Sequence, residues 1–485
     1  MYRIYIIILF FIFSPNISTY SQDVISANIN EIIATAQSDS PDFLLAKTRQ
    51  NNAYWIYVGA KSIFKPQLNL SATLPSFDRS ISAITLPDGT RSFVNSSFMT
   101  NSVGVSLNQI ISATGGSITV GTDLQRLDDF GSSGTPANYL SSPVSIRFEQ
   151  PIFRLNPYKW DKKEAEINYE ASKKRYVEDR ERIAFDAVNN FFDLYISKIN
   201  LQESIRNSEY LDSLAVNAEG RFGVGRISET ELLQIQLTAK NAKGTVARNR
   251  LNVQNKIEVL RDFLGIQKQV DFDLATPQTL TLFEIDKDKA VEYANKNRSV
   301  TEDFRLRLLT AERQMESAEK NNGPSLQLRG SFGLTQSSET IGGAYQNLLD
   351  REQVSLSIDI PLADFGRRRA QEEIAKSNLE LTVLQLQQDR VSFEREILVN
   401  VEQFKLKRDQ LTLSEEALAI AKKRVDIAKK RFDIGKIDVT NLNIAIQEEL
   451  SAQQSYYSTL WDFWRAHYTI RNLTLYDFEK DQPLE

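Results

Sequence analysis

Cysteine is absent from this 485-residue chain, and histidine occurs once, as His467. The absence of cysteine excludes a disulfide framework, a thiolate metal site, a cysteine nucleophile and a lipid-acceptor cysteine after an export signal. A lone histidine within the aromatic stretch 461–468 is usually a packing residue and not a catalyst or a metal ligand. We therefore expect no metal, no cofactor, and membrane attachment through folded protein.

Long apolar runs are also missing, except at the N-terminus. Arg3 supplies a basic start, Ile4–Phe13 is apolar, and small residues at 19–21 suit a cleavage point. We predict a signal peptide over 1–21. No later stretch approaches the roughly 18 uninterrupted apolar residues of a transmembrane helix, so a membrane-embedded part would be a β-barrel.

A marked excess of one charge is missing too, because 58 Lys and Arg face 63 Asp and Glu, for a net charge of −5. This balance gives no reason to expect nucleic acid as a partner. The acidic pairs at 372–373 and 415–416 are adjacent on predicted helices and do not share a face, so we expect solvated carboxylates there. The sequence does not indicate an enzyme.

An internal repeat organises the chain. A shift of 210 positions places 144–146 on 354–356 and the tip sequence 221–225 on 431–435. Upstream, a shift of 258 places Pro66 on Pro324, so the first half carries 48 more residues than the second, the difference between the two shifts. The predicted organisation is a first repeat at 22–265, a linker at 266–283, a second repeat at 284–478 and a tail at 479–485.

Each repeat begins with an amphipathic helical stretch, 41–64 or 286–320, that leads through a proline toward strands. In 68–74 and again in 354–360 every second residue is apolar. This alternation predicts strands with one apolar and one polar face.

The additional residues of the first half contain two more alternating runs, 103–110 and 117–124. Gly115 and Gly116 lie between them and favour a tight turn. The sequence therefore predicts an extra β-hairpin over 98–126.

After Pro151 and Pro361 the apolar period becomes helical. Every seventh residue from Val383 to Phe432 is apolar with one interruption, which predicts a coiled-coil seam. A helix from Gly366 to Phe432 would be about 100 Å long at 1.5 Å per residue.

Both long helices are predicted to end in the same way. Gly225 and Gly435 suit the left-handed position after a helix, and new N-caps follow at Ser228, with Glu231 completing a capping box, and at Asp438. Each repeat is thus expected to contain a long antiparallel helical hairpin with a tight tip, near 223–228 in the first and near 433–438 in the second.

The two-fold repeat, the proline-marked junctions such as 361–367, and the paired tips resemble the TolC family of outer-membrane efflux proteins along nearly the whole mature chain. This resemblance implies an α+β membrane protein in which a homotrimer shares one transmembrane β-barrel, continued by a long α-helical coiled-coil barrel. It also implies an outer-membrane location in a Gram-negative bacterium, with most of the chain in the periplasm and lipid around the barrel. Four strands per subunit would give a barrel of 12 strands and six would give 18, and the sequence leaves both open.

The resemblance further implies partners and sites. The tips would dock a periplasmic membrane-fusion adaptor, which links the channel to an inner-membrane pump of the proton-driven or ABC type. The docking residues implied are Arg221, Phe222, Gly225, Ile227, Ser228, Arg431, Phe432, Gly435, Ile437 and Asp438. The periplasmic gate would involve Asn441, Leu442 and Ile444.

The expected function is export of small molecules or proteins across the periplasm and outer membrane, in tripartite efflux or in type I secretion. The alternative is a periplasmic coiled-coil adaptor or scaffold without a pore. An adaptor would normally have one helical hairpin beside compact β-domains, so the duplication with strands in each half favours the channel.

Overall fold

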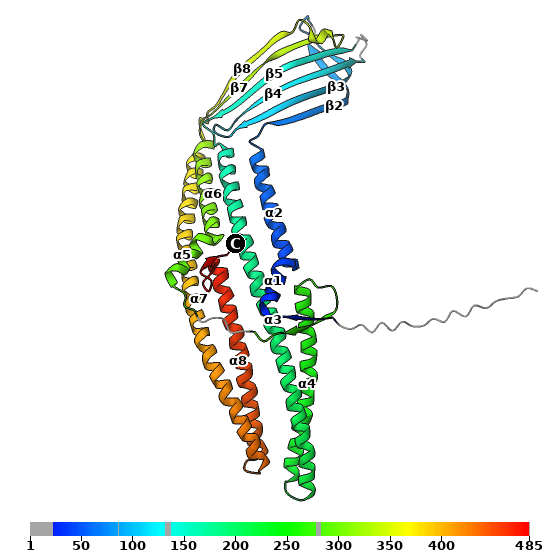
Figure 1. Cartoon of the computed structure of the whole chain (residues 1–485). Helices are drawn as coiled ribbons and strands as arrows, with labels where there is room; N and C mark the ends of the chain where they lie inside the picture. The colour runs from blue at the N-terminus through cyan, green and yellow to red at the C-terminus, as the bar shows by residue number, and fades with distance from the viewer. Residues whose placement is uncertain (1–22, 86, 131–136, 278–282, 485) are drawn as a thin grey trace, which may run out of the picture.

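The computed structural model describes residues 23–85, 87–130, 137–277 and 283–484, and the predicted signal peptide at 1–21 lies outside them. The subunit is elongated, with a β-sheet at one end, two helical hairpins at the other, and a mixed region between them (Figure 1). The fold is therefore α+β, with strands and helices largely segregated along its length.

Two pairs of long helices form the hairpins. Helix α3 (Pro157–Gly223) and helix α7 (Arg367–Asp433) each have 67 residues, or about 100 Å at 1.5 Å per residue. They are followed by α4 (Glu229–Phe263) and α8 (Val439–Thr474). The predicted length of the second long helix and the position of both tips are confirmed.

The predicted seam of α7 is buried along its lower half. Ile397, Phe404, Leu411 and the seventh residues that follow are buried down to Phe432. Val383, at the start of the predicted seam, is 38% exposed. In this upper part of α7 the buried face instead carries Leu386 and Phe393. The buried stripe thus changes register along the helix, as a straight α-helix does relative to a strict seven-residue repeat.

A single antiparallel sheet of six strands has the order β2-β3-β4-β5-β7-β8. Its strands are β2 (Gln67–Thr85), β3 (Arg91–Ile111), β4 (Gly116–Asp129), β5 (Asn138–Ile152), β7 (Ser325–Ser338) and β8 (Leu349–Asp359), with a short 3-10 helix (Gly343–Tyr345) between the last two.

The extra hairpin predicted over 98–126 is β3 and β4, and it is longer than predicted. It spans 91–129, with the turn after Ile111 closed by the Gly115 amide, which donates to the Ile111 carbonyl at 2.8 Å. Serine, asparagine and threonine on both faces of the outer part of β3 interrupt the alternation there, and this hides the true length from pattern analysis.

The middle region surrounds the upper parts of the long helices. Its elements are β1 (Asp23–Ala27), α1 (Ile29–Asp39), α2 (Pro41–Ser62), β6 (Val270–Leu274), α5 (Lys287–Asn297), α6 (Val300–Asn321), β9 (Tyr476–Asp477) and β10 (Gln482–Pro483). The main hydrophobic core lies here, with Phe191, Phe192, Phe272 and Phe463 fully buried.

Three expectations for this region are corrected. The predicted linker at 266–283 contains β6, which pairs in parallel with β1 because Val270 and Phe272 pack into the core. The stretch 286–320 is two helices, α5 and α6. The Ser299 amide and hydroxyl donate hydrogen bonds to the Glu178 carboxylate at 2.6 and 3.0 Å, and these bonds hold the short segment that joins the two helices. The tail at 479–485 includes β10, which pairs with β9.

Among the helices described, none is both long and apolar enough to cross a membrane. Within the same residues, no group of three or more His, Asp or Glu side chains is placed to hold a metal ion.

Candidate functional site

The two hairpin tips have the same backbone geometry. Gly225 and Gly435 have φ values of +70° and +72°, a conformation that glycine adopts without steric cost. The Arg226 amide donates to the Arg221 carbonyl at 2.8 Å, and the Lys436 amide does the same for Arg431 at 2.8 Å. Each long helix therefore ends in a Schellman motif.

The returning helices begin with the predicted caps. The Ser228 hydroxyl accepts from the Glu231 amide at 3.2 Å, while the Glu231 carboxylate accepts from the Ser228 amide at 2.9 Å. In the second tip, a carboxylate oxygen of Asp438 accepts from the amide and the side chain of Asn441, at 2.8 and 3.0 Å. These local bonds fix both turns without help from a partner.

The two tips also pack against each other within one subunit. The Arg221 guanidinium lies 5.7 Å from the centre of the Phe432 ring, and the Lys429 ammonium lies 5.3 Å from that of Tyr210. An apolar cluster lies beneath these contacts and joins all four long helices: Leu211, Leu214, Ala218, Ile235, Ala239, Ala242, Val425, Ala428, Phe432, Val439, Leu442, Ala445 and Ile446.

Most of the predicted docking residues are at the surface. The exposed ones are Arg221, Phe222, Gly225, Ser228, Arg431, Gly435 and Asp438; Ile227 and Ile437 are half-buried, and Phe432 is buried. The structure thus gathers them on one end of the subunit. Sequence analysis missed Val224 and Ile434, which are 70% and 66% exposed at the apex of each tip. Their signal was their shared position, one residue before each turn glycine.

The predicted gate residues are divided between the surface and the core. Asn441 and Ile444 are exposed on the first turns of α8, whereas Leu442 is fully buried among the apolar residues that join the hairpins. Leu442 therefore packs α8 against its own subunit and does not line an opening.

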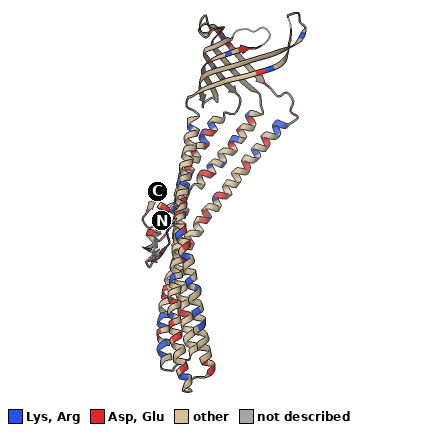
Figure 2. Cartoon of the chain, turned by 90° about the vertical axis from the view of Figure 1, so that its right-hand side faces the viewer, with Lys and Arg blue, Asp and Glu red and all other residues tan. Residues whose placement is uncertain are grey.

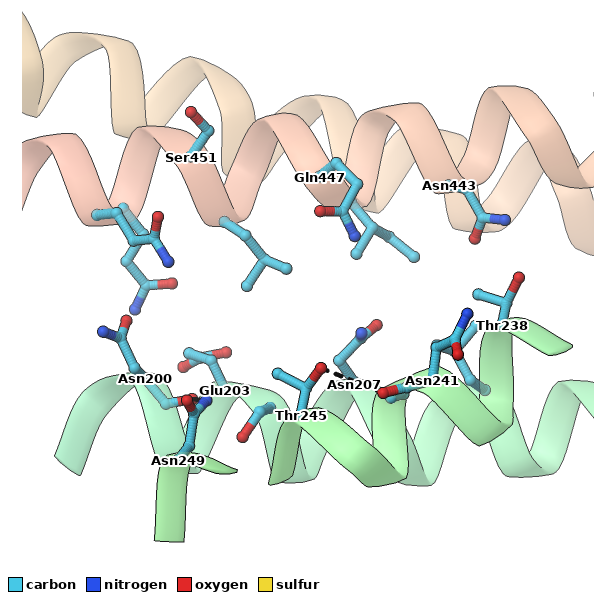
Figure 3. Close-up of a pocket in the computed structure, with 17 residues that line it drawn as sticks. Asn200, Glu203, Asn207, Thr238, Asn241, Thr245, Asn249, Asn443, Gln447 and Ser451 are labelled. Carbon is cyan, nitrogen blue, oxygen red and sulfur yellow. Dashed lines mark hydrogen bonds between the residues drawn. The ribbon is translucent and has the colours of Figure 1, made fainter. Parts of the chain in front are cut away.

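A polar groove of about 600 Å³ separates the hairpins above the apolar tip cluster. In Figure 3, Asn443, Gln447 and Ser451 of α8 face the amide and hydroxyl groups of α3 and α4. Glu203 is the charged residue of its lining. Amides and hydroxyls both donate and accept hydrogen bonds, so the groove can be filled by water. The two helical hairpins are joined by apolar contacts above and below this groove.

The sheet has one apolar and one polar face. The residues that pair in one row across the sheet, Leu68, Leu107, Val120, Ile146 and Phe332, are apolar on five strands, and this row ends on β8 at Glu352. The next rung, Gln67, Asn108, Thr119, Arg147, Ser331 and Gln353, is polar on all six strands.

Charge is unevenly distributed over the subunit. Figure 2 shows charged residues along the whole length of the helices and few on the strands. Those on the polar face of the sheet include Arg329, whose Nε lies 3.2 Å from a carboxylate oxygen of Glu149. The apolar face is exposed in the single subunit, with Leu68 at 72% and Leu356 at 56%. An apolar face that stays exposed on a sheet marks a surface for lipid or protein.

Comparison with known proteins agrees with this geometry. Residues 294–472 match the family model described as outer membrane efflux protein. No curated protein sequence matches the chain.

Three similar solved structures are outer-membrane proteins. The Campylobacter jejuni CmeC outer membrane channel has a TM-score of 0.65 at 17% identity, covering 94% of this chain and 87% of that one. For VceC from Vibrio cholerae the TM-score is 0.63 at 15% identity, covering 94% of this chain and 97% of that one. For the open state of the Neisseria gonorrhoeae MtrE channel the TM-score is 0.61 at 12% identity, covering 93% and 90%. The family match over 294–472 and the fold shared over more than 90% of the chain make this protein similar to TolC-like outer membrane efflux proteins.

Proposed function

We propose that three copies of this chain form an outer-membrane export channel that spans the periplasm and works with a periplasmic adaptor and an inner-membrane pump. Outer membrane efflux proteins are channels and not enzymes, so the function consists of passage, gating and docking. The observation that carries the proposal is a sheet with one apolar and one polar face that leads directly into two capped helical hairpins, in each of which the first helix is about 100 Å long.

Apolar stripes on both lateral edges of the helical part support association of copies. From Val399 to the C-cap of α7, every seventh residue is apolar and exposed: Val399, Leu406, Leu413, Ile420, Ile427 and Ile434. On the opposite edge, α4 exposes Leu233, Leu237 and Leu251, and α2 exposes Trp55 and Ile56. Figure 1 shows α7 on one side of the subunit and α2 and α4 on the other. In a ring of copies, each α7 edge would therefore meet the next copy's α2 and α4 edge.

The two faces of the sheet suit a barrel wall in a membrane. The apolar rung through Leu107 and Ile146 would face lipid, and the polar rung through Thr119 and Arg147 would line a wet lumen. The helical hairpins would continue this lumen as a coiled-coil barrel in the periplasm.

The exposed tips are the proposed docking surface for the adaptor. Phe222 and Arg431 are exposed at matching tips, and Val224 and Ile434 add apolar area beside the turn glycines. Aromatic and arginine side chains are enriched among residues that dominate protein interfaces. The cargo would be small molecules or proteins, delivered by a proton-driven or an ABC-type pump.

The proposal is tested by purifying the protein from outer membranes and reconstituting it into planar lipid bilayers. We expect stable trimers on native gels and discrete ion-conducting steps. A soluble periplasmic protein without conductance would instead support a coiled-coil scaffold.

A further inference from the structure

The two edge strands of the sheet, β2 and β8, each have a free side. An edge strand carries backbone amides and carbonyls that have no partner in the sheet. In the hydrocarbon part of a membrane every such group has to be paired, which only closure of the sheet achieves. The shortest strand, β8, has 11 residues, enough for a tilted strand of roughly 9 to 11 residues to span the membrane.

The register of the six strands specifies how closure occurs. Gln67, the first residue of β2, starts the polar rung that reaches β8 at Gln353. Gln353 lies six residues before Asp359, the last residue of β8. This row of paired residues runs perpendicular to the strands. Measured from it, the end of β8 next to the helices therefore lies six residues lower than the end of β2 next to the helices.

The lower end of β2 follows helix α2 and the lower end of β8 precedes helix α7. We take these two helix-to-strand junctions to lie at one height in a ring of copies around an axis normal to the membrane. A step of six residues over six strands, with about 3.3 Å per residue and about 4.8 Å between strands, corresponds to a strand tilt of about 35°. This tilt falls at the edge of the roughly 35–45° range of transmembrane barrels. The sheet therefore has the slope that closure from six strands per copy requires.

The same alignment keeps the faces continuous across the junction. With Gln67 opposite Asp359 of the next copy, Leu68 faces Ile358 and Asn69 faces Ser357. The apolar residues thus stay on one side and the polar residues on the other, whereas a shift by one residue would exchange them.

We propose that β2 of one copy pairs with β8 of the next, with Asn69 opposite Ser357, and that three copies close a barrel of 18 strands. This inference rests on the proposed trimeric channel. Hairpin β3–β4 is then part of the barrel wall and sets the width of the exit. Because barrel diameter grows roughly linearly with strand number, six strands per copy give an exit about one and a half times as wide as four would.

The junction is tested by engineered cross-linking, for which the chain has no cysteine of its own to interfere. In the pair Asn69→Cys with Ser357→Cys, directly opposed Cβ atoms would lie about 4.5–5.5 Å apart, within reach of a disulfide. We expect covalent dimers and trimers after mild oxidation. The matched control pairs Asn69→Cys with Gln353→Cys, four residues away along β8, and is expected to cross-link at least tenfold less.

The width is tested by deletion of 91–129, which removes β3 and β4 and leaves four strands per copy. The probe is Gln353→Cys on the polar face, labelled with maleimide-polyethylene glycols of increasing size. We expect the largest polymer that reacts to fall in radius by about one third, following the strand number. The matched control replaces 80–96, where β2 and β3 pair beyond the end of β4, with an Asn-Gly turn and is expected to keep the original size limit.

The outcomes separate this inference from the proposed function. Trimers that conduct ions but cross-link equally at both pairs, or keep the size limit after the 91–129 deletion, would overturn the 18-stranded barrel and leave the channel intact. A monomeric protein without conductance would overturn the channel itself. If the deletion variant does not fold, the cross-linking pairs decide, because a cyclic covalent trimer through β2 and β8 fixes six strands per copy.

Discussion

Arg221 lies over the ring of Phe432, with the guanidinium carbon 5.7 Å from the ring centre, and this contact joins the tip of α3 to the tip of α7. The corresponding residues of the two tips, Arg431 and Phe222, are both exposed. One arginine and one phenylalanine of the duplicated tip sequence therefore hold the subunit together, and the other two are available to a partner.

The first prediction concerns this contact. Arg221→Ala removes a cation–π interaction of about 0.5–1 kcal/mol at an exposed site, so the tips should separate more often. We expect faster hydrogen exchange at the backbone amides of 221–228 and 431–438. Arg226→Ala is the matched control, because Arg226 is exposed at the same tip. Equal exchange in both variants would show that the contact does not couple the tips.

The second prediction concerns docking. Arg431→Glu reverses an exposed charge, and Gly435→Ala places a side chain at φ +72°, which costs about 1 kcal/mol. We expect the double variant to lose export while trimers still assemble in the outer membrane. Lys405→Glu, an equal charge reversal at an exposed position in the middle of α7 and off the apolar stripe, should export normally. Normal export by the double variant would remove the docking assignment.

The tips are the part of the site that the sequence predicted best. Their structure depends on neighbours within six residues: a glycine after the helix, and a capping side chain that bonds the residue three positions further, Glu231 in one tip and Asn441 in the other. Such local chemistry is visible in any single sequence. The long helices were predictable for a related reason, since a seven-residue apolar period persists over many turns.

What the sequence did not predict depends on contacts between distant segments. The Arg221 and Phe432 contact joins residues more than 200 positions apart, and the pairing of β1 with β6 crosses a similar distance. The β2–β3 turn was not predicted, although Pro87-Asp88-Gly89 is a typical turn sequence, because the polar residues in 92–102 interrupt the alternation that would have marked the strand after it. The burial of Leu442 likewise follows from packing between hairpins, which a heptad pattern on one helix does not specify.

The third prediction concerns the polar groove between the hairpins. Asn207→Leu with Gln447→Leu places apolar side chains on both walls, and their contact should replace groups that water hydrates. We expect the thermal unfolding midpoint to rise by a few degrees and channel openings in bilayers to become rarer. Gln234→Leu, the same change at an exposed position of α4 outside the groove, should alter neither. Unchanged openings in the double variant would show that the hairpins do not move apart along this groove.

The fourth prediction concerns pH. His467 is 4% exposed beside Phe283 and Tyr468, and burial lowers its pKa from 6.5 to about 3, with further lowering by Arg471 and Lys480 against an opposing effect of Asp477. Because the folded pKa lies below the unfolded one, the unfolded chain binds more protons between the two values. The contribution of this group to stability is therefore complete above about pH 6.5 and is lost as the pH falls toward 3.

His467→Phe removes this dependence while keeping an aromatic ring of similar shape. Between pH 7 and pH 5 the original protein should lose about 2 kcal/mol of unfolding free energy that the variant keeps, measured by urea denaturation. His467 is the one histidine of the chain, so the substitution removes the whole histidine contribution to the pH dependence. Parallel losses in both proteins would show that His467 is already protonated, or hydrated, in the folded state.

The last prediction concerns the exposed stripe on α7. Leu413 and Ile420 are 65% and 70% exposed, and each lies seven residues from the next exposed apolar position. One face of the lower half of the helix therefore carries an apolar seam that the described residues of the subunit leave exposed. Leu413→Asp with Ile420→Asp should prevent trimers, because each buried leucine or isoleucine contributes about 1.5–3 kcal/mol and a carboxylate at the seam costs more.

The subunit itself should keep its fold, since its own core on α7 uses Leu411 and Leu418, on another face of the helix. Native gels and light scattering measure the trimer, and circular dichroism checks that helix content is unchanged. Glu415→Lys, an exposed charge change between the two substituted positions but on the other side of the helix, is the matched control and should leave the trimer intact. A trimer that survives both aspartates would place the contact between copies on another surface and leave the stripe exposed to water.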